Sequence, residues 1–212
     1  MSTDTTTRIV ELIASKICHD LISPVGAVSN GVEILEEIGA DDDVTSLISF
    51  SATQASAKLK TMRLAYGMGG SDESIKLEDV HKIFDDFVSG DNRVSQNWDP
   101  HMNLGFEPHK GFAKLLTCAL MMAADSLPKG GELTVAPEGE HTIVVKATGE
   151  NAAFRDGVMD AFDGKKEAGH LDPKLIHPYL TSLFATKYGF KLQLEPSTDN
   201  FICLRLTQSI VD

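Results

Sequence analysis

Apolar residues recur every three or four positions near the start of the chain, which predicts an amphipathic helix over residues 6–38. Its apolar face is formed by Ile13, Ile17, Leu21, Val25, Val28, Val32 and Leu35. At about 100° per residue these positions fall within an arc of roughly 120°, and His19 projects to the opposite side. We therefore expect His19 to be solvent-exposed on a helix whose other face is buried.

A second helix is predicted through about Tyr66, because Gly39 is typical of a helix end and Asp41–Asp43 provide an acidic cap for a new helix. The two helices would form a hairpin. Its contact face is rich in Ala, Ser and Thr, which leaves one hairpin with a thin core. Since two such hairpins make a four-helix bundle, we expect a homodimer.

The polar, glycine-rich segment 67–74 predicts a boundary between a helical hairpin domain, residues 1–68, and a second domain, residues 75–212. Helix and strand patterns alternate beyond it. We expect helices over 78–88, 110–127, 152–162 and 173–188, strands over 132–136 and 142–147, and a hairpin pairing 191–195 with 201–207. The predicted fold class is α+β, a helical hairpin followed by an α/β sandwich.

Composition narrows the function classes. The 212 residues carry a formal net charge of −12, so neither nucleic acid nor an anionic membrane is an expected partner. The polar start lacks the apolar core of a signal peptide, and the longest apolar run, 115–124, is about half of a membrane span. Three cysteines without paired spacing indicate neither a disulfide framework nor a zinc site. We expect a cytoplasmic protein that holds no metal.

The run from His19 to Pro24 places a histidine beside a carboxylate inside the first helix. A single helical histidine is often a surface residue with no role, and this reading stays open. Pro24 favours a role, because a proline in a helix interior costs about 3 kcal/mol. Kinks of that cost tend to lie beside functional positions.

The sequence His19-Asp20-Leu21-Ile22-Ser23-Pro24 resembles the phospho-acceptor motif of sensor histidine kinases. Segment 17–35, with Gly26 and Gly31, is similar to the ChpT-type histidine phosphotransferases. The resemblance implies that His19 accepts a phosphoryl group and that Asp20 orients the ring or accepts its proton. Ser23 stands where bifunctional kinases carry a threonine or asparagine that positions a hydrolytic water.

The second half resembles the ATP-binding domain of histidine kinases over segments 115–131 and 174–205. It departs from that domain at two places. Met122 stands where the kinases carry an asparagine for the metal, and segment 147–151, Ala-Thr-Gly-Glu-Asn, stands where an Asp-x-Gly-x-Gly motif would hold adenine. Methionine cannot ligate magnesium and alanine cannot accept the adenine amino proton. We expect no ATP binding and no cofactor; ATP held by substituted contacts is the alternative.

The hairpin also predicts which residues of the second helix lie near His19. If the chain turns at about residue 41, the residue level with His19 is near position 63, where Arg63 stands with Lys60 one turn away. A guanidinium there could steady a phosphoryl group or a partner's carboxylate. An ordinary surface arginine is the alternative.

The resulting hypothesis is a histidine phosphotransferase that relays phosphate through His19 between receiver-domain aspartates. The resemblance implies that its partners are the receivers of a hybrid histidine kinase and of response regulators, with Mg²⁺ carried by the receiver. One alternative is a non-catalytic scaffold that binds receivers. Another is an HD-type metal phosphohydrolase, suggested by His19-Asp20, although no second histidine occurs before His81.

Overall fold

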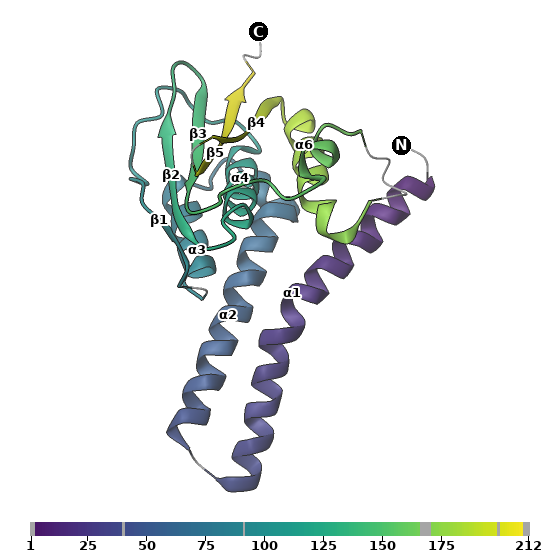
Figure 1. The fold of residues 1–212 in the computed structure, drawn as a ribbon, viewed down its shortest axis with the longest axis vertical. Helices are drawn as coiled ribbons and strands as arrows, with labels where there is room; N and C mark the ends of the chain where they lie inside the picture. The colour runs from purple at the N-terminus through teal and green to yellow at the C-terminus, as the bar shows by residue number, and fades with distance from the viewer. Residues whose placement is uncertain (1–2, 40, 91, 166–170, 199, 210–212) are drawn as a thin grey trace.

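The computed structural model describes residues 3–39, 41–90, 92–165, 171–198 and 200–209. Two long helices, α1 (Thr3–Ile38) and α2 (Asp42–Tyr66), form an antiparallel hairpin that projects from the α/β part (Figure 1). Gly39 adopts a left-handed φ of 85° after α1. Asp41 caps α2 by accepting a hydrogen bond from the Val44 amide at 2.9 Å. The structure thus confirms the predicted helical hairpin and both of its end signals.

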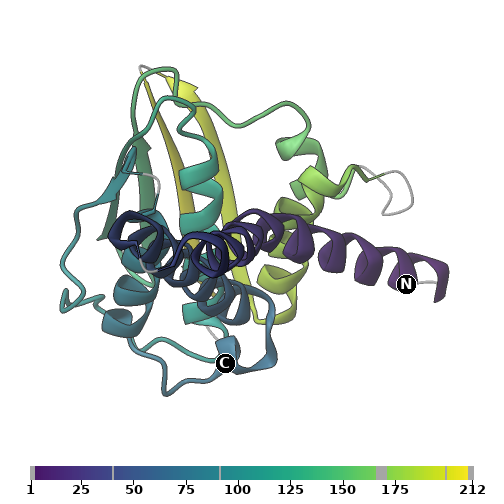
Figure 2. The same ribbon diagram turned by 90° about the horizontal axis from the view of Figure 1, so that it is seen from below.

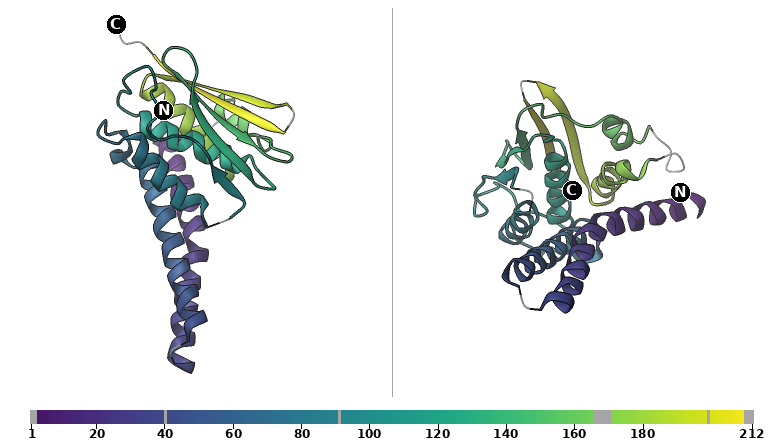
Figure 3. Two further views of the ribbon diagram at one scale, coloured as in Figure 1. Left: turned by 90° about the vertical axis from the view of Figure 1, so that its left-hand side faces the viewer. Right: turned by 60° about the horizontal axis from the view of Figure 1, so that its bottom comes forward.

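The α/β part is a five-stranded sheet with helices packed on one face. Its elements are η1 (Met68–Ser71), α3 (Leu77–Val88), β1 (Val94–Gln96), α4 (Phe112–Asp125), β2 (Gly131–Pro137), β3 (Thr142–Thr148), α5 (Val158–Phe162), η3 (Pro173–Leu175), α6 (Ile176–Lys187), β4 (Phe190–Thr198) and β5 (Phe201–Gln208). The strand order is β1-β2-β3-β5-β4, with only β1 and β2 parallel. Figure 3 shows the helices lying between the sheet and the hairpin. This arrangement confirms the predicted α+β class and α/β sandwich.

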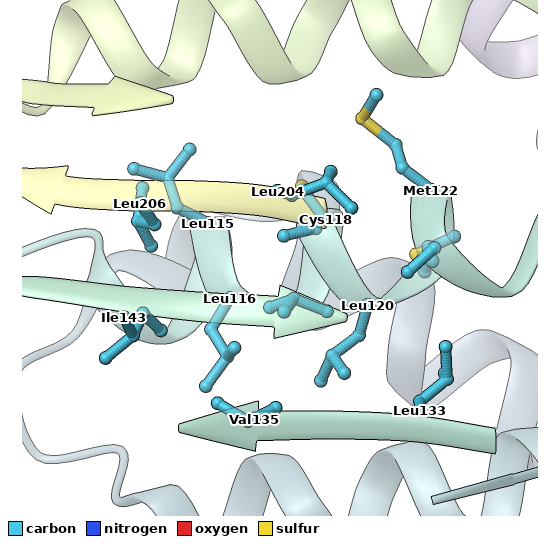
Figure 4. Packing of buried hydrophobic residues seen from close by; sticks show 14 of the residues in the cluster. Leu115, Leu116, Cys118, Leu120, Met122, Leu133, Val135, Ile143, Leu204 and Leu206 are labelled. Carbon is cyan, nitrogen blue, oxygen red and sulfur yellow. The ribbon is translucent and has the colours of Figure 1, made fainter. Parts of the chain in front are cut away.

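Helix α4 is the centre of the core, because every residue from Phe112 to Ala123 is buried. It crosses the inner face of the sheet, whose alternate residues point toward it: Leu133, Val135, Ile143, Val145, Ile202, Leu204 and Leu206. In Figure 4, Leu116 points toward Val135, whereas Met122 points away from the strands. Across the described residues, no helix combines the length and apolar character needed to cross a membrane.

Two features differ from the sequence prediction. Strand β1 was not predicted, because three residues are too few to show alternation and its partner β2 follows only after α4. The predicted helix 152–162 is wrong over its first half. Residues 153–157 are not helical: the Ala153 amide donates to the Ser126 carbonyl, and Gly157 has a φ of 82°, so α5 begins only at Val158.

The end of α2 is fixed to the α/β part by a buried lysine. Lys114 of α4 is 1% exposed, and its Nζ donates to the carbonyl oxygens of Ala65 at 2.9 Å and Gly67 at 2.7 Å. The last carbonyls of a helix lack partners in the helix and carry the negative end of its dipole, which suits an ammonium group. The start of the segment predicted to be a linker is therefore fixed to the α/β part.

The hairpin also shares apolar contacts with the α/β part. Leu64 and Ala65 of α2 belong to the core around α4, while Leu12 of α1 packs in a smaller cluster with Leu175 and Ile176. Figure 2 shows the N-terminal part of α1 running next to α6. Buried contacts therefore join the two parts across the predicted boundary. The division into domains 1–68 and 75–212 stays a prediction.

Candidate functional site

His19 lies on the solvent side of α1, as the helical pattern predicts. Its side chain is 88% exposed, and its Nδ1 lies 3.2 Å from Oδ1 of Asp20. The Asp20 side chain is 25% exposed and turns back toward the protein. The structure therefore brings His19 and Asp20 together as a pair with one open side.

Lys16 completes this pair from one turn earlier on α1. Its Nζ donates to Oδ2 of Asp20 at 2.8 Å. Burial alone would raise the pKa of the Asp20 carboxyl, but the hydrogen bonds from Lys16 and His19, with the charges of Lys16 and Lys58, lower that pKa below its ordinary value. Asp20 is consequently a carboxylate near neutral pH.

The charge of Asp20 decides the tautomer of His19. A carboxylate has only lone pairs to offer, so the proton of the neutral imidazole must lie on Nδ1, which donates to Asp20. The lone pair of Nε2 is then free on the exposed side of the ring. This is the state of an imidazole nucleophile.

Pro24 lies inside α1 and is buried. Because proline has no N–H, the carbonyl of Asp20, four residues earlier, loses its usual helical partner. The structure supplies another: Nζ of Lys58 on α2 donates to the Asp20 carbonyl oxygen at 3.1 Å. Helix α1 changes direction along its length (Figure 1), as expected for a proline inside a helix.

None of the remaining predicted site residues has a described contact with His19. Ser23 is exposed on α1, one turn beyond His19. Lys60 and Arg63 line a groove with Ile13 and Ile17 of α1, and no described contact joins either cation to His19. Counting residues along a hairpin ignores the rotation of each helix about its axis, so it predicts the level of a side chain but not the direction in which it points. Their role, like that of Ser23, stays a prediction.

Sequence reasoning missed the two lysines that contact Asp20. The spacing of Lys16 and Asp20, four residues apart on a predicted helix, was a signal that could have identified the first. Lys58 lies 38 residues from Asp20, so its contact depends on how the two helices rotate against each other. No local pattern reports that rotation.

A second histidine, His177, lies at the start of α6 and is 2% exposed. Its Nδ1 lies 2.8 Å from the Tyr66 hydroxyl, and its Nε2 lies 3.1 Å from the Cys118 carbonyl oxygen. Since a carbonyl only accepts, Nε2 carries the proton and Nδ1 accepts from Tyr66. Burial lowers the pKa of His177 to about 4, and the charge of Lys16 acts in the same direction. Both ring nitrogens are occupied.

A cavity of about 280 Å³ lies between the end of α4, the loop before α5 and the start of α6. Met122, Ser126, Phe154, His177 and Pro178 line it together with three carboxylates, Asp125, Asp156 and Asp172, and two cations, Arg155 and Lys174. Met122 offers a thioether, a ligand that magnesium does not take in proteins. Within the part of the chain that the structure describes, no group of three or more His, Cys, Asp or Glu side chains could hold a metal ion.

An exposed histidine paired with a carboxylate on a kinked helix suits a residue that accepts and passes on a phosphoryl group. Residues 77–200 match the family described as histidine phosphotransferase C-terminal domain. The chain is 32% identical over 195 residues to the protein phosphotransferase ChpT of Brucella abortus (strain 2308), covering 90% of this chain and 91% of that protein.

A solved structure of a bacterial phosphotransferase has the same fold, with a TM-score of 0.78, 30% sequence identity and 97% of each chain covered. The chain belongs to the ChpT-type histidine phosphotransferases, and its function is phosphotransfer in a His-Asp phosphorelay. The phosphohydrolase and scaffold alternatives are not favoured.

Proposed function

We propose that His19 is the residue through which the phosphoryl group passes, and that it exchanges this group with aspartates of receiver domains on a hybrid histidine kinase and on response regulators. The observation that carries the proposal is the exposed Nε2 of an imidazole whose Nδ1–H is held by Asp20. The three free cysteines, Cys18, Cys118 and Cys203, suit the reducing cytoplasm in which we place the exchange.

The transfer needs little from this chain beyond position and charge. Nε2 of His19 attacks the phosphorus of the receiver's aspartyl phosphate, the N–P bond forms and the P–O bond to the aspartate breaks, leaving a carboxylate. The phosphorylated ring then carries a positive charge with its proton on Nδ1, and the Asp20 carboxylate stabilises that charge. Mg²⁺ belongs to the receiver in this scheme.

We propose further that the hairpin forms a homodimer. Large apolar side chains remain exposed along one chain's hairpin: Val10, Ile22, Val25, Val32, Ile34, Ile38, Leu47, Phe50 and Leu59. An exposed apolar surface of this extent is typical of a protein interface, and a second hairpin would cover it as a four-helix bundle.

The variant Val32→Asp tests the homodimer, because a charge at this position stays in solvent in a single chain but would be buried in the dimer. Light scattering should show this variant as a monomer, and Leu183→Asp, at an exposed apolar site on α6, unchanged.

The α/β part, in our proposal, binds no ATP at working concentrations and serves as a docking surface for receivers. Two features support the absence of ATP binding: Met122 at the place of a metal ligand, and a cavity in which three carboxylates outnumber two cations and so repel a triphosphate. Calorimetry should detect no heat of Mg-ATP binding up to millimolar ligand, where a site of about −4 kcal/mol would register. Micromolar binding would contradict this part of the proposal.

One incubation tests the central proposal. A receiver carrying labelled aspartyl phosphate is mixed with the full chain and with His19→Gln. We expect acid-labile label on the wild-type chain and none on the variant. Binding of the receiver without label on the chain would indicate a scaffold, and metal-dependent release of phosphate with no labelled intermediate would indicate a phosphohydrolase.

A further inference from the structure

Asp20 has three oxygen atoms, and each accepts a hydrogen bond from a different side chain. Oδ1 accepts from His19 and Oδ2 from Lys16, while the backbone oxygen accepts from Lys58 at 3.1 Å. The third bond differs from the others, because it replaces a helical bond that Pro24 cannot make. The residue that contacts His19 is therefore also the residue whose carbonyl lacks its helical hydrogen-bond partner.

The missing hydrogen bond could change the position of the Asp20 carboxylate relative to the His19 ring. The missing bond leaves the peptide group after Asp20 free to tilt outward to water, as solvent-side carbonyls do in bent helices. Such a tilt would rotate the Asp20 side chain away from its position beside the ring of His19, the preceding residue in the chain. Lys58 opposes the tilt, since its half-buried stem comes from α2, where Ala57 and Thr61 are buried in the tightly packed part of the helix.

We propose that Lys58 is a positioning residue for phosphotransfer: by holding the Asp20 carbonyl that Pro24 leaves without a partner, it keeps the Asp20 carboxylate in line with Nδ1 of His19. The proposal rests on the proposed function of His19 as phospho-acceptor. Lys58 touches neither the ring nor the phosphoryl group; it acts through Asp20. Its charge also adds to that of Lys16 in favouring the ionised Asp20 carboxyl.

Two phosphoryl donors distinguish a role of Lys58 in positioning Asp20 from a role in binding the receiver. Phosphoramidate is a small donor that needs no docking surface, whereas a phosphorylated receiver needs one. Lys58→Met should slow labelling of His19 from both donors by about tenfold, the effect of losing one hydrogen bond to a charged group. Lys110→Met, which removes an exposed lysine before α4, should leave the rate with phosphoramidate unchanged. A fall with the receiver alone would show that Lys58 contacts the partner and would overturn the proposal.

Pro24 provides the sharper test. In Pro24→Ala the residue regains an N–H, so the Asp20 carbonyl regains its helical partner and no longer depends on Lys58. Lys58→Met should then cost less than about twofold with either donor, a coupling of the kind that a double-mutant cycle measures. The proposal would be overturned if Lys58→Met lowered the labelling rate equally with Pro24 and with Pro24→Ala, or if it did not lower the rate when Pro24 is present. Lys58→Arg, which keeps a charged donor, should restore most of the rate.

Circular dichroism and thermal unfolding of each variant establish that it is folded at the assay temperature. Should Lys58→Met not fold with Pro24 present, the comparison is made with Lys58→Gln, and the carbonyl ¹³C shift of Asp20 reports the bond directly. That shift should differ from wild type in Lys58→Gln and match it in Lys58→Arg; a shift unchanged in Lys58→Gln would overturn the proposal. If phosphate reaches a residue other than His19 in the wild-type chain, the proposed function itself fails. Equal labelling of His19 in wild type and Lys58→Met leaves that function intact and refutes only the role of Lys58.

Discussion

His19 and His177 show the same side chain in two opposite environments, one open to solvent and one closed. His19 has one nitrogen bound to a carboxylate and the other open to solvent, with 88% of the side chain exposed. His177 is buried and has both nitrogens bound, to Tyr66 and to a backbone carbonyl. Burial with full hydrogen bonding turns the second histidine into a structural link between α2, α4 and α6. In our proposal, His19 differs from His177 as a nucleophile because the lone pair of its Nε2 has no hydrogen-bond partner among the described contacts.

We expect the largest effect when the phosphate label is compared between variants of the two histidines. His19→Gln should abolish acid-labile phosphate on the chain and leave the melting temperature near that of wild type, because the residue contributes little to the core. His177→Gln should retain the label and lower the melting temperature. Radiolabelling from a phosphorylated receiver, with calorimetry on both variants, checks the pair. Label that persisted in His19→Gln would remove the distinction between the two regions.

Acid should destabilise the protein through His177. The unfolded chain takes up this proton below its ordinary pKa of 6.5, whereas the native side chain stays neutral down to a pKa of about 4. Stability is therefore lost as the pH falls from 6.5 to 4, by about 3 kcal/mol for a shift of this size. Urea unfolding of wild type and His177→Gln over this range measures the difference, and parallel pH curves would contradict the buried neutral state.

Asp20→Asn should slow transfer to His19 by about 100-fold, within the range for a misplaced proton at a catalytic imidazole. An amide can donate to Nδ1, which favours the tautomer with the proton on Nε2 and removes the nucleophilic lone pair. The native carboxylate excludes that tautomer. Single-turnover rates with phosphoramidate measure the effect; a rate near wild type would show that Asp20 does not set the tautomer.

The smallest effect concerns the link between the hairpin and the α/β part. Tyr66→Phe removes the hydrogen bond to Nδ1 of His177 and should cost about 1 kcal/mol of unfolding free energy. It should also raise the pKa of His177, because a bond that favours the neutral ring is lost. The acid-induced loss of stability should therefore shrink in this variant, while labelling of His19 is unchanged.

Local patterns made part of this structure predictable. The helical period placed His19 on the open side of α1, and the Gly39 and acidic cap signals located the turn of the hairpin. These features depend on neighbours within a few residues. The strand pattern of the α/β part was predicted for the same reason, except for β1, which is too short to show a period.

Features that depend on distant contacts were not predictable. The glycines after Tyr66 indicated a loose linker, yet Lys114 binds the carbonyls there from a helix almost 50 residues away. The pairing of Tyr66 with His177 spans 111 residues. Counting along the hairpin predicted Arg63 near His19, but it could not identify Lys58, which the packing of α1 on α2 brings to Asp20. Rotation about a helix axis is set by tertiary packing, and the sequence pattern does not report it.

The most direct test of the central claim is a long-range ¹H–¹⁵N correlation spectrum of the full chain after phosphorylation, with ³¹P coupling identifying the modified nitrogen. We predict one phosphorylated ring, that of His19, with phosphorus on Nε2 and a proton on Nδ1, while the His177 signals stay unmodified. Phosphorus on Nδ1 of His19, or on any other residue, would contradict it.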